Sequence, residues 1–249
     1  MNDKVSIVTP SYNSQRFIKD TIDSVFAQTY ENWEMIIVDD NSKDNSVEYI
    51  KELIKNNSKI KLISLEKNVG AAEARNIALD EAQGRYVAFL DSDDIWLEDK
   101  LQEQLSFMTK NEYAFTFTSY MTFSEDGQTE FKTIKAPMEL DYIAYCKNTM
   151  IGCLTVMIDR DKVGSFQMPL IKSSHDMALW LLIMRRGFKA YGLDKVLAKY
   201  RVVSTSNTSK KYKAIQDVWK VYREIERINL FKSSWYFVNY LYNAIKKRV

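Results

Sequence analysis

Short apolar runs alternate with amphipathic stretches over about the first hundred residues of the chain. Short apolar runs bounded by polar residues are typical of buried strands, and apolar residues three or four positions apart are typical of helices. The runs predict strands at 5–10, 35–38, 60–63 and 86–90, and the stretches between them predict helices at 17–26, 47–54 and 71–82. Strands that alternate with helices in this way indicate an α/β fold with a mostly parallel sheet flanked by helices.

The pattern becomes less regular beyond Asp94, where strands and helices no longer alternate strictly. The elements expected there are strands at 114–118 and 154–158, a hairpin turn at Glu125-Asp126-Gly127, a helix at 177–186 ended by Gly187, and helices near 212–228 and 234–247. Asp-Gly at a turn and Gly after a helix both fit the backbone geometry of these positions. We therefore expect a parallel half, then a mixed half, then a helical tail.

The composition supports a folded chain and limits its class. The 249 residues are 46% hydrophobic and 13% aromatic, which is enough for a sizeable core and argues against wholesale disorder. Two cysteines are too few for a disulfide scaffold and fit a reducing compartment. The formal charge of only +2 speaks against a nucleic-acid-binding protein, which would normally carry a strong basic excess.

The charge is unevenly distributed along the chain. Residues 210–249 hold 10 Lys+Arg and 3 Asp+Glu, whereas residues 1–209 hold 25 and 30. The apolar run at 5–8 starts too close to the first residue for a secretory signal, and no stretch reaches the roughly 18 apolar residues of a spanning helix. We expect a cytoplasmic protein with an acidic body and a basic tail.

Polar segments follow three of the four early strands. These are Thr9-Pro10-Ser11-Tyr12-Asn13, Asp39-Asp40-Asn41-Ser42 and Asp91-Ser92-Asp93-Asp94. Ligands of parallel α/β sheets bind at the carboxyl ends of the strands, where the loops share one crevice. The sequence therefore predicts that the three segments are neighbours at a binding site.

Three carboxylates stand within four residues at Asp91, Asp93 and Asp94. Mg²⁺ and Mn²⁺ prefer a few carboxylates together with phosphate oxygens, so the cluster suits a metal–diphosphate site. Aspartates are also favoured at the first turn of a helix, and this alternative stays open for the motif taken alone.

Other residues near the expected crevice could hold a nucleotide. The Asp40 carboxylate can accept the N–H of a uracil ring, or it can cap the following helix. Tyr12 can stack on a base or simply pack. Lys67 and Arg75 are candidate diphosphate ligands, or else a solvated lysine and a helix-face arginine.

The chain lacks the motifs of several other kinds of binding and catalytic site. The chain has no Gly-x-Gly-x-x-Gly after its first strand, no Walker A loop and no Gly-x-Ser-x-Gly elbow. Its two cysteines, Cys146 and Cys153, and its single histidine cannot form a structural zinc site.

Four segments together resemble a known family: residues 5–13, 37–42, 68–70 with 74–76, and 86–94. In this order they resemble the family 2 glycosyltransferases, over roughly residues 4–205. The resemblance implies a GT-A fold at 1–209, with a Rossmann-like nucleotide-sugar-binding half at 1–110 and a mixed acceptor half at 111–209. It leaves 210–249 as a basic, aromatic helical tail.

The resemblance also implies a donor site for a nucleotide sugar, most often a UDP-sugar. The residues at matching positions are Thr9, Pro10, Tyr12 and Asp40 for the uridine, Asp91, Ser92 and Asp93 for a DxD motif that binds Mn²⁺ or Mg²⁺, Asp94 as an adjacent carboxylate, and Arg75 near the donor. Lys67 remains a candidate donor ligand from its place beside the crevice.

Downstream, residues 174–181 resemble the family segment in which a Glu-Asp pair opens a helix and its Asp is the catalytic base. Asp176 matches the base, and His175 stands where Glu is usual. Asp176 could instead simply complement the helix dipole. His175 and Trp180 are candidates for the acceptor side.

Residues 200–204 resemble the Tyr-Arg segment that leads into the donor-closing loop of the family. Arg201, Ser206 and Ser209 are therefore candidates for contacts with phosphate or acceptor. A solvated connector is the alternative for this polar stretch.

These residues predict a metal-dependent inverting transfer to a hydroxyl of a glycan acceptor. By resemblance the acceptor is expected to be lipid-linked, in bacterial O-antigen or capsule synthesis. The substitution at His175 leaves open a non-catalytic nucleotide-sugar or glycan-binding module of the same fold. A nucleotidyltransferase would need a first loop that is rich in Gly and carries Arg or Lys, and residues 9–13 contain none of these.

The tail combines aromatic and basic residues. Such a terminal helix suits the anionic cytoplasmic surface of the inner membrane, where a lipid-linked acceptor would lie. The alternative is a helix packed on the catalytic domain or on a partner subunit, and a homodimer stays open.

Overall fold

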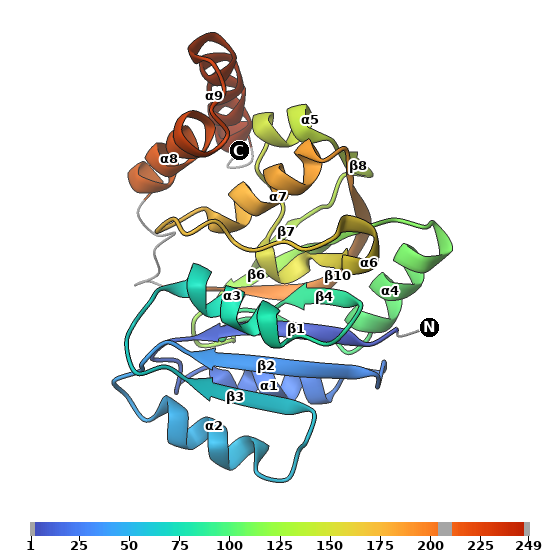
Figure 1. Ribbon diagram of the computed structural model, residues 1–249, viewed down its shortest axis with the longest axis vertical. Coiled ribbons are helices and arrows are strands. Elements are labelled where there is room, and N and C mark those ends of the chain that lie inside the picture. Colours follow the sequence, from blue (N-terminus) through green and yellow to red (C-terminus); the bar gives the residue numbers. More distant parts are fainter. Residues whose placement is uncertain (1–2, 204–210, 247–249) are drawn as a thin grey trace.

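A twisted sheet runs through the body of the protein and helices cover both of its faces (Figure 1). The computed structural model describes residues 3–203 and 211–246. The strands are β1 (Val5–Ser11), β2 (Trp33–Asp39), β3 (Ile60–Ser64), β4 (Tyr86–Phe89), β5 (Ile95–Trp96), β6 (Phe115–Ser124), β7 (Glu130–Ile134), β8 (Glu139–Leu140), β9 (Met157–Asp159) and β10 (Ala190–Val202). Their order in the sheet is β3-β2-β1-β4-β9-β6-β10-β5, with β7 beside β6 and β8 beside β10.

The sheet changes character along this order. Strands β3, β2, β1 and β4 run parallel to one another, as the alternation of the early chain predicts. Strand β9 is antiparallel to both β4 and β6, whereas β6 and β10 are parallel. The expected α/β fold with a mostly parallel first half and a mixed second half is confirmed.

The helices are α1 (Ile18–Phe26), α2 (Ser46–Ile54), α3 (Ala71–Glu81), α4 (Lys100–Lys110), α5 (Tyr142–Lys147), α6 (Arg160–Val163), α7 (His175–Arg185), α8 (Lys211–Lys220) and α9 (Leu230–Lys246). Successive side chains of β1 enter different cores, because side chains alternate across a strand. Ile7 lies in the cluster formed with α1, α2 and α4, and Val8 lies in the cluster formed with α3 and α7. Each such buried branched side chain contributes about 1.5–3 kcal/mol.

The expected strand at 154–158 is partly wrong, since residues Cys153–Thr155 form a 3₁₀ turn and only Met157–Asp159 pairs in the sheet. The cause is tertiary. Trp96 Nε1 donates to the Leu154 carbonyl at 2.8 Å, and Gln104 Nε2 donates to the Thr155 carbonyl at 2.9 Å. These carbonyls are satisfied by side chains of other elements, so they need no neighbouring strand.

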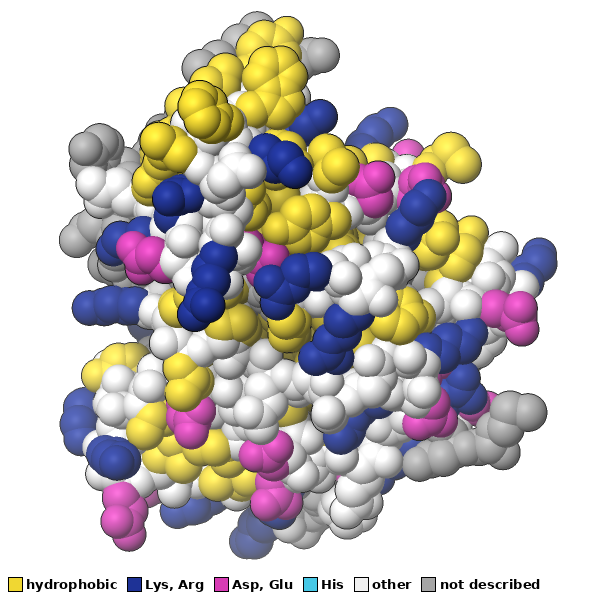
Figure 2. Space-filling model, turned by 45° about the horizontal axis from the view of Figure 1, so that its top comes forward, with side chains coloured by type: hydrophobic (Ala, Val, Ile, Leu, Met, Phe, Trp, Pro, Cys, Tyr) yellow, Lys and Arg dark blue, Asp and Glu magenta, His cyan; other side chains and the backbone are white. Residues whose placement is uncertain are grey.

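The tail packs against the body through one side. Tyr222, in a π-helical turn at Val221–Ile225, donates from its hydroxyl to the Cys146 carbonyl, and Asn243 of α9 donates to the Lys147 carbonyl at 3.0 Å. Tyr236 of α9 is buried in the same apolar cluster as α7. The opposite side of α9 is exposed, and Figure 2 shows hydrophobic side chains gathered at that end of the molecule. The boundary at 209/210 stays a prediction.

Candidate functional site

The ends of β1 and β2 are joined by hydrogen bonds across the sheet edge. The Asp40 amide donates to the Ser11 carbonyl at 2.8 Å, and the Asn13 amide donates to Ser42 Oγ at 2.9 Å. The Ser14 amide likewise donates a hydrogen bond to Ser46 Oγ at 2.8 Å. The expectation that the first two polar segments are neighbours is confirmed.

Asp40 fixes the loop that leads into α3. Its two carboxylate oxygens accept from the amides of Val69 and Gly70 at 2.6 and 2.8 Å. Gly70 adopts a φ of 93°, in the region that favours glycine, and this turn aims both amides at the carboxylate. Asp40 is thus buried and bound within the chain, and its contact with a uracil ring stays a prediction.

Arg75 joins three elements at the centre of the site. It lies on α3 with only 4% of its surface exposed, its Nη2 donates to Asp91 after β4, and its Nη1 lies 2.6 Å from His175 Nε2 at the start of α7. Burial works to lower the pKa of Arg75, but the negative charge and the hydrogen bond of Asp91, together with smaller contributions from other neighbours, raise that pKa above its ordinary value. The guanidinium therefore stays charged.

His175 serves as the hydrogen-bond acceptor of this arginine. Burial lowers the pKa of the imidazole, and the positive charge of Arg75 lowers it further, so the ring is held neutral. A guanidinium can only donate, so Nε2 must accept and the proton must sit on Nδ1. The next residue, Asp176, is in the first turn of α7 and half-buried.

Asp176 lies close enough to Arg75 for its charge to raise the pKa of that residue. The same holds for Tyr145 and Cys153, whose pKa values are raised first by burial and also by Asp176. No motif in the sequence points to Tyr145 or Cys153 as neighbours of the site. The third polar segment and the start of α7 are therefore brought together by the fold.

The acidic segment concentrates negative charge in a partly buried position. Burial and the Asp91 charge raise the pKa of Asp93 to about 6. Burial, with the charge of Asp93, raises the pKa of Asp94 well above its usual range. Within residues 3–203 and 211–246, no three His, Cys, Asp or Glu side chains converge on one point that could hold a metal ion.

The expected ligation of a metal by Asp91, Asp93 and Asp94 therefore stays a prediction, and the geometry favours Asp91 and Asp93 over Asp94. Asp94 is 1% exposed, and its Oδ1 accepts from the Arg201 amide at 2.8 Å. The raised pKa of Asp93 shows that this carboxylate would gain from a nearby cation. Asp91 and Asp93 fit Mg²⁺ or Mn²⁺ as part of a ligand set completed by phosphate oxygens and water.

Arg201 lies behind the acidic segment rather than in an open position. Its guanidinium donates to the carbonyls of Asp93 and Glu125 at 2.7 and 3.0 Å and to Asp20 Oδ2 at 2.9 Å. It also lies between the rings of Phe17 and Phe123, 4.9 and 4.5 Å from their centres. The expected contact of Arg201 with phosphate is corrected. Its buried guanidinium already donates to these three acceptors and holds the acidic segment in place.

The expectation that Trp180 lies on the acceptor side is also corrected, because this residue belongs to the core. The side chain is fully buried, with its ring 5.4 Å from that of Phe89 and 5.3 Å from that of Phe115. A side chain of α7 that is buried against β4 and β6 cannot contact an acceptor.

The other predicted residues differ in their access to the crevice. Thr9 and Pro10 are buried in β1, Ser92 is half-buried, and Tyr12 and Lys67 are exposed. Thr9 Oγ1 is buried without a hydrogen-bond partner among the described residues. Ser206 and Ser209 lie outside the described residues.

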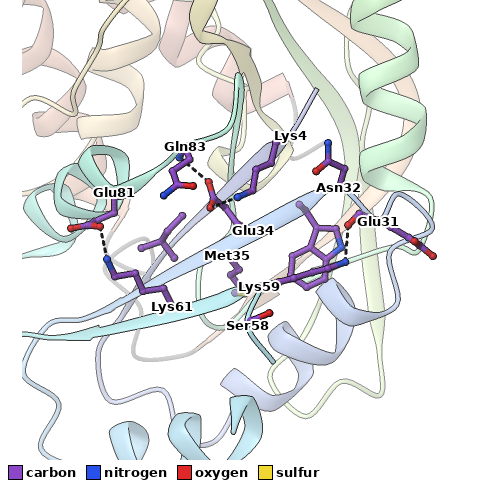
Figure 3. A pocket seen from close by; sticks show the side chains of 12 residues that line it. Lys4, Glu31, Asn32, Glu34, Met35, Ser58, Lys59, Lys61, Glu81 and Gln83 are labelled. Atoms are coloured by element: carbon purple, nitrogen blue, oxygen red, sulfur yellow. Dashed lines mark hydrogen bonds and ion pairs between the residues drawn. The ribbon is translucent and has the colours of Figure 1, made fainter. Parts of the chain in front are cut away.

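A separate hollow of about 450 Å³ lies at the opposite, amino-terminal edge of the strands (Figure 3). Two ion pairs lie in it, Lys4 with Glu34 at 2.7 Å and Lys61 with Glu81, and Lys59 Nζ donates to the Glu31 backbone carbonyl at 2.8 Å. This edge carries none of the predicted site residues, so the carboxyl ends of the strands remain the candidate site.

Comparison with known proteins agrees with this placement. The model of the family described as Glycosyl transferase family 2 matches residues 6–168. TuaG of Bacillus subtilis, which carries a provisional name as a teichuronic acid biosynthesis glycosyltransferase, is 51% identical over 98% of this chain and 97% of its own length. WfgD of Escherichia coli, named a UDP-Glc:α-D-GlcNAc-diphosphoundecaprenol β-1,3-glucosyltransferase, is 39% identical over 98% of this chain and 94% of its own.

Solved structures resemble the fold as a whole. Residues 1–349 of TarS from S. aureus, in complex with UDP-GlcNAc, match 96% of this chain and 71% of that one, with a TM-score of 0.68 at 19% identity. The mannosyltransferase PcManGT from Pyrobaculum calidifontis, in complex with GDP-Man and Mn²⁺, matches 90% of this chain and 64% of that one, with a TM-score of 0.70 at 17% identity. The expected GT-A fold is confirmed.

Proposed function

This chain belongs to glycosyl transferase family 2, and from that premise we propose that it transfers a sugar from a UDP-sugar, with inversion, to a hydroxyl of a lipid-linked glycan. That the chain is a glycosyltransferase follows from the family and from its named relatives. The observation that carries the finer proposal is Arg75, which contacts Asp91 on the donor side and His175 on the acceptor side.

The donor would lie across the ends of β1, β2 and β4. Tyr12 is exposed at the end of β1, where a nucleobase could stack on its ring. Asp91 and Asp93 would hold Mn²⁺ or Mg²⁺, which when bound supplies positive charge to the diphosphate leaving group. UDP-GlcNAc in the TarS complex and GDP-Man with Mn²⁺ in the mannosyltransferase complex support a nucleotide sugar and a divalent cation as ligands.

Asp176 would act as the base. A half-buried carboxylate in the first turn of α7, beside the Arg75–His175 pair, can accept the proton of an acceptor hydroxyl as that oxygen attacks the anomeric carbon. Attack from the face opposite the leaving diphosphate inverts the configuration, so an α-linked UDP-sugar would give a β-linked product. The β-1,3 linkage in the name of WfgD is consistent with this outcome.

The acceptor would be a sugar attached through a diphosphate to a polyprenyl lipid. WfgD uses α-D-GlcNAc-diphosphoundecaprenol by its name, and TuaG is provisionally named for teichuronic acid biosynthesis. The half at 111–209, which includes α5 and α7, would bind this acceptor, with His175 as a positioning residue at its edge. The reaction would then take place at the cytoplasmic face of the membrane.

A transfer assay with synthetic GlcNAc-diphosphate-lipid tests the proposal. A panel of UDP-sugars is offered with Mn²⁺ or Mg²⁺, and the linkage of the product is read by NMR. We expect one UDP-sugar to give a β-linked disaccharide, and EDTA to abolish the transfer reversibly. An α-linked product or full activity in EDTA contradicts the inverting, metal-dependent reaction. Binding of the nucleotide sugar with no transfer to any glycan favours the non-catalytic binding module instead.

A further inference from the structure

Helix α9 carries an apolar stripe on the side that faces away from the body. Its side chains include Phe231, which is 88% exposed, and the exposed Leu230, Trp235, Val238 and Tyr242. Positions 231, 235, 238 and 242 follow one another at intervals of four, three and four, so they share one helix face. Isolated exposed apolar residues are ordinary, whereas a continuous stripe over three turns marks an interaction surface.

The other side of the same helix already has its partner. Ser233 and Tyr236 are buried, and Phe237 and Tyr240 pack against the apolar cluster that contains α7. Helix α9 also contacts α5, so its attachment to the body does not use the outer stripe. The stripe is therefore presented to the surroundings by a helix whose orientation is fixed.

The charge of the terminal segment that carries this stripe is predominantly positive. Helix α9 contains no Asp or Glu, and the exposed Lys220, Arg227 and Lys232 lie in the same terminal segment. Residues 210–249 hold 10 Lys+Arg against 3 Asp+Glu and end in Lys246-Lys247-Arg248 before the last residue. Figure 2 shows Lys and Arg side chains bordering the hydrophobic ones at this end of the molecule.

We propose that the outer face of α9 docks on an anionic bilayer surface, with the helix axis lying in the plane of the interface. Tryptophan and tyrosine favour the headgroup level, and basic residues add attraction to anionic lipids. No helix in the described part of the chain is long and apolar enough to cross a membrane. The inference rests on the proposed function, since docking would hold the site beside an acceptor anchored in the same bilayer.

The charge of this segment favours an anionic bilayer over a second copy of the chain as the occupant of the outer face of α9. Two copies joined through this face would bring two segments with a net charge of +7 together, which costs electrostatic free energy. An anionic lipid surface instead complements that charge, and the attraction falls as salt screens it. The bilayer is therefore the occupant that the observations favour.

Co-sedimentation of the full chain with vesicles tests the docking. Phosphatidylcholine vesicles with and without phosphatidylglycerol are used, in the absence of nucleotide sugar and acceptor, so that the result is independent of the transfer reaction. We expect binding to the anionic vesicles, weakened by high salt. The double variant Phe231→Asp/Trp235→Asp should reduce the partition coefficient about tenfold or more, because it removes two inserted aromatic side chains.

The control is Phe131→Asp, which places one aspartate, against two in the α9 variant, at a 58% exposed phenylalanine in β7. It should bind vesicles as the unchanged protein does, and circular dichroism should show that all variants are folded. No binding of the unchanged protein to anionic vesicles overturns the proposal, as does equal loss in the control. A dimer in gel filtration that the α9 variant converts to a monomer also overturns it, in favour of a second copy.

Discussion

Arg75 and His175 stand a hundred positions apart in the chain, yet Nη1 of the arginine lies 2.6 Å from Nε2 of the histidine. The contact fixes the first turn of α7, which carries Asp176, relative to the acidic segment that begins at Asp91. A neutral histidine can stand where the family has Glu, because the Arg75 guanidinium needs a hydrogen-bond acceptor at this position and the Nε2 atom supplies one without a negative charge. The presence of His175 where Glu is usual is therefore no reason to expect an inactive site.

Replacement of His175 should separate positioning from chemistry. His175→Ala leaves a buried guanidinium N–H without its acceptor and frees the start of α7, so we expect kcat to fall about tenfold to a hundredfold. His175→Gln offers an amide oxygen at similar reach and should restore most of the rate. Steady-state kinetics with a fixed donor measures both. A fully active alanine variant, or a glutamine variant as poor as alanine, contradicts a positioning role.

The buried acidic segment should lower the stability of the metal-free protein. Asp94→Asn removes a charge that burial disfavours, while the amide oxygen can still accept from the Arg201 amide. We expect the variant to be about 1–2 kcal/mol more stable than the unchanged protein in EDTA at pH 7. Urea unfolding measures the difference, and Asp23→Asn, at an exposed ion pair with Lys19, is the control.

The pH dependence of that difference has a definite sign. The folded state raises the pKa of Asp94 above the ordinary 3.8, so it binds that proton more tightly than the unfolded chain does. The stability due to this proton is present below the ordinary pKa and is lost as the pH rises through the folded value. The advantage of Asp94→Asn should therefore shrink as the pH is lowered from 7 towards 4. An advantage that grows on acidification contradicts the raised pKa.

A second buried charge lies far from the reaction, at the start of α4. Lys100 is fully buried, its Nζ donates to Gln104 Oε1 at 2.8 Å and lies 4.1 Å from the centre of the Trp96 ring. Burial lowers the pKa of Lys100 from 10.5 to about 7. The unfolded chain therefore binds this proton more tightly, and the folded state gains stability as the pH rises from 7 towards 10.

Lys100→Met should remove that gain. Between pH 7 and 10, the unfolding free energy of the unchanged protein should rise by about 1–3 kcal/mol relative to the variant, since the cation–ring contact offsets part of the burial effect. Denaturation at several pH values measures the change. The half-exposed Lys195, substituted by methionine, should show little of it. A constant difference across this pH range contradicts a buried, shifted lysine.

Local patterns predicted the early elements well because their causes are local. The apolar spacing of Ile18, Ile22 and Val25 makes one face of α1 whatever it packs on, and the runs at β1 and β2 leave no alternative to burial. The resemblance likewise indicated the sheet edge at which the site forms.

The errors occurred where partners distant in the chain decide the outcome. Arg201 is drawn away from ligands by Asp20 and by two phenylalanine rings that no spacing in the sequence connects. Trp180 continues the apolar face of α7 into the core, although it lies four residues after Asp176. Asp94 follows two carboxylates but turns inward, because the Arg201 amide binds it.

We propose that Asp176 is the base of an inverting transfer from a UDP-sugar, and one variant tests this role most directly. Asp176→Asn keeps the shape of the side chain but cannot accept the acceptor proton, so the rate of transfer in single turnovers should fall about 10²–10⁴-fold. Calorimetry should give the same affinity for UDP as in the unchanged protein, which shows that the donor site is intact. If Asp176→Asn transfers sugar at the full rate with unchanged UDP binding, Asp176 is not the base and the account of the site is wrong.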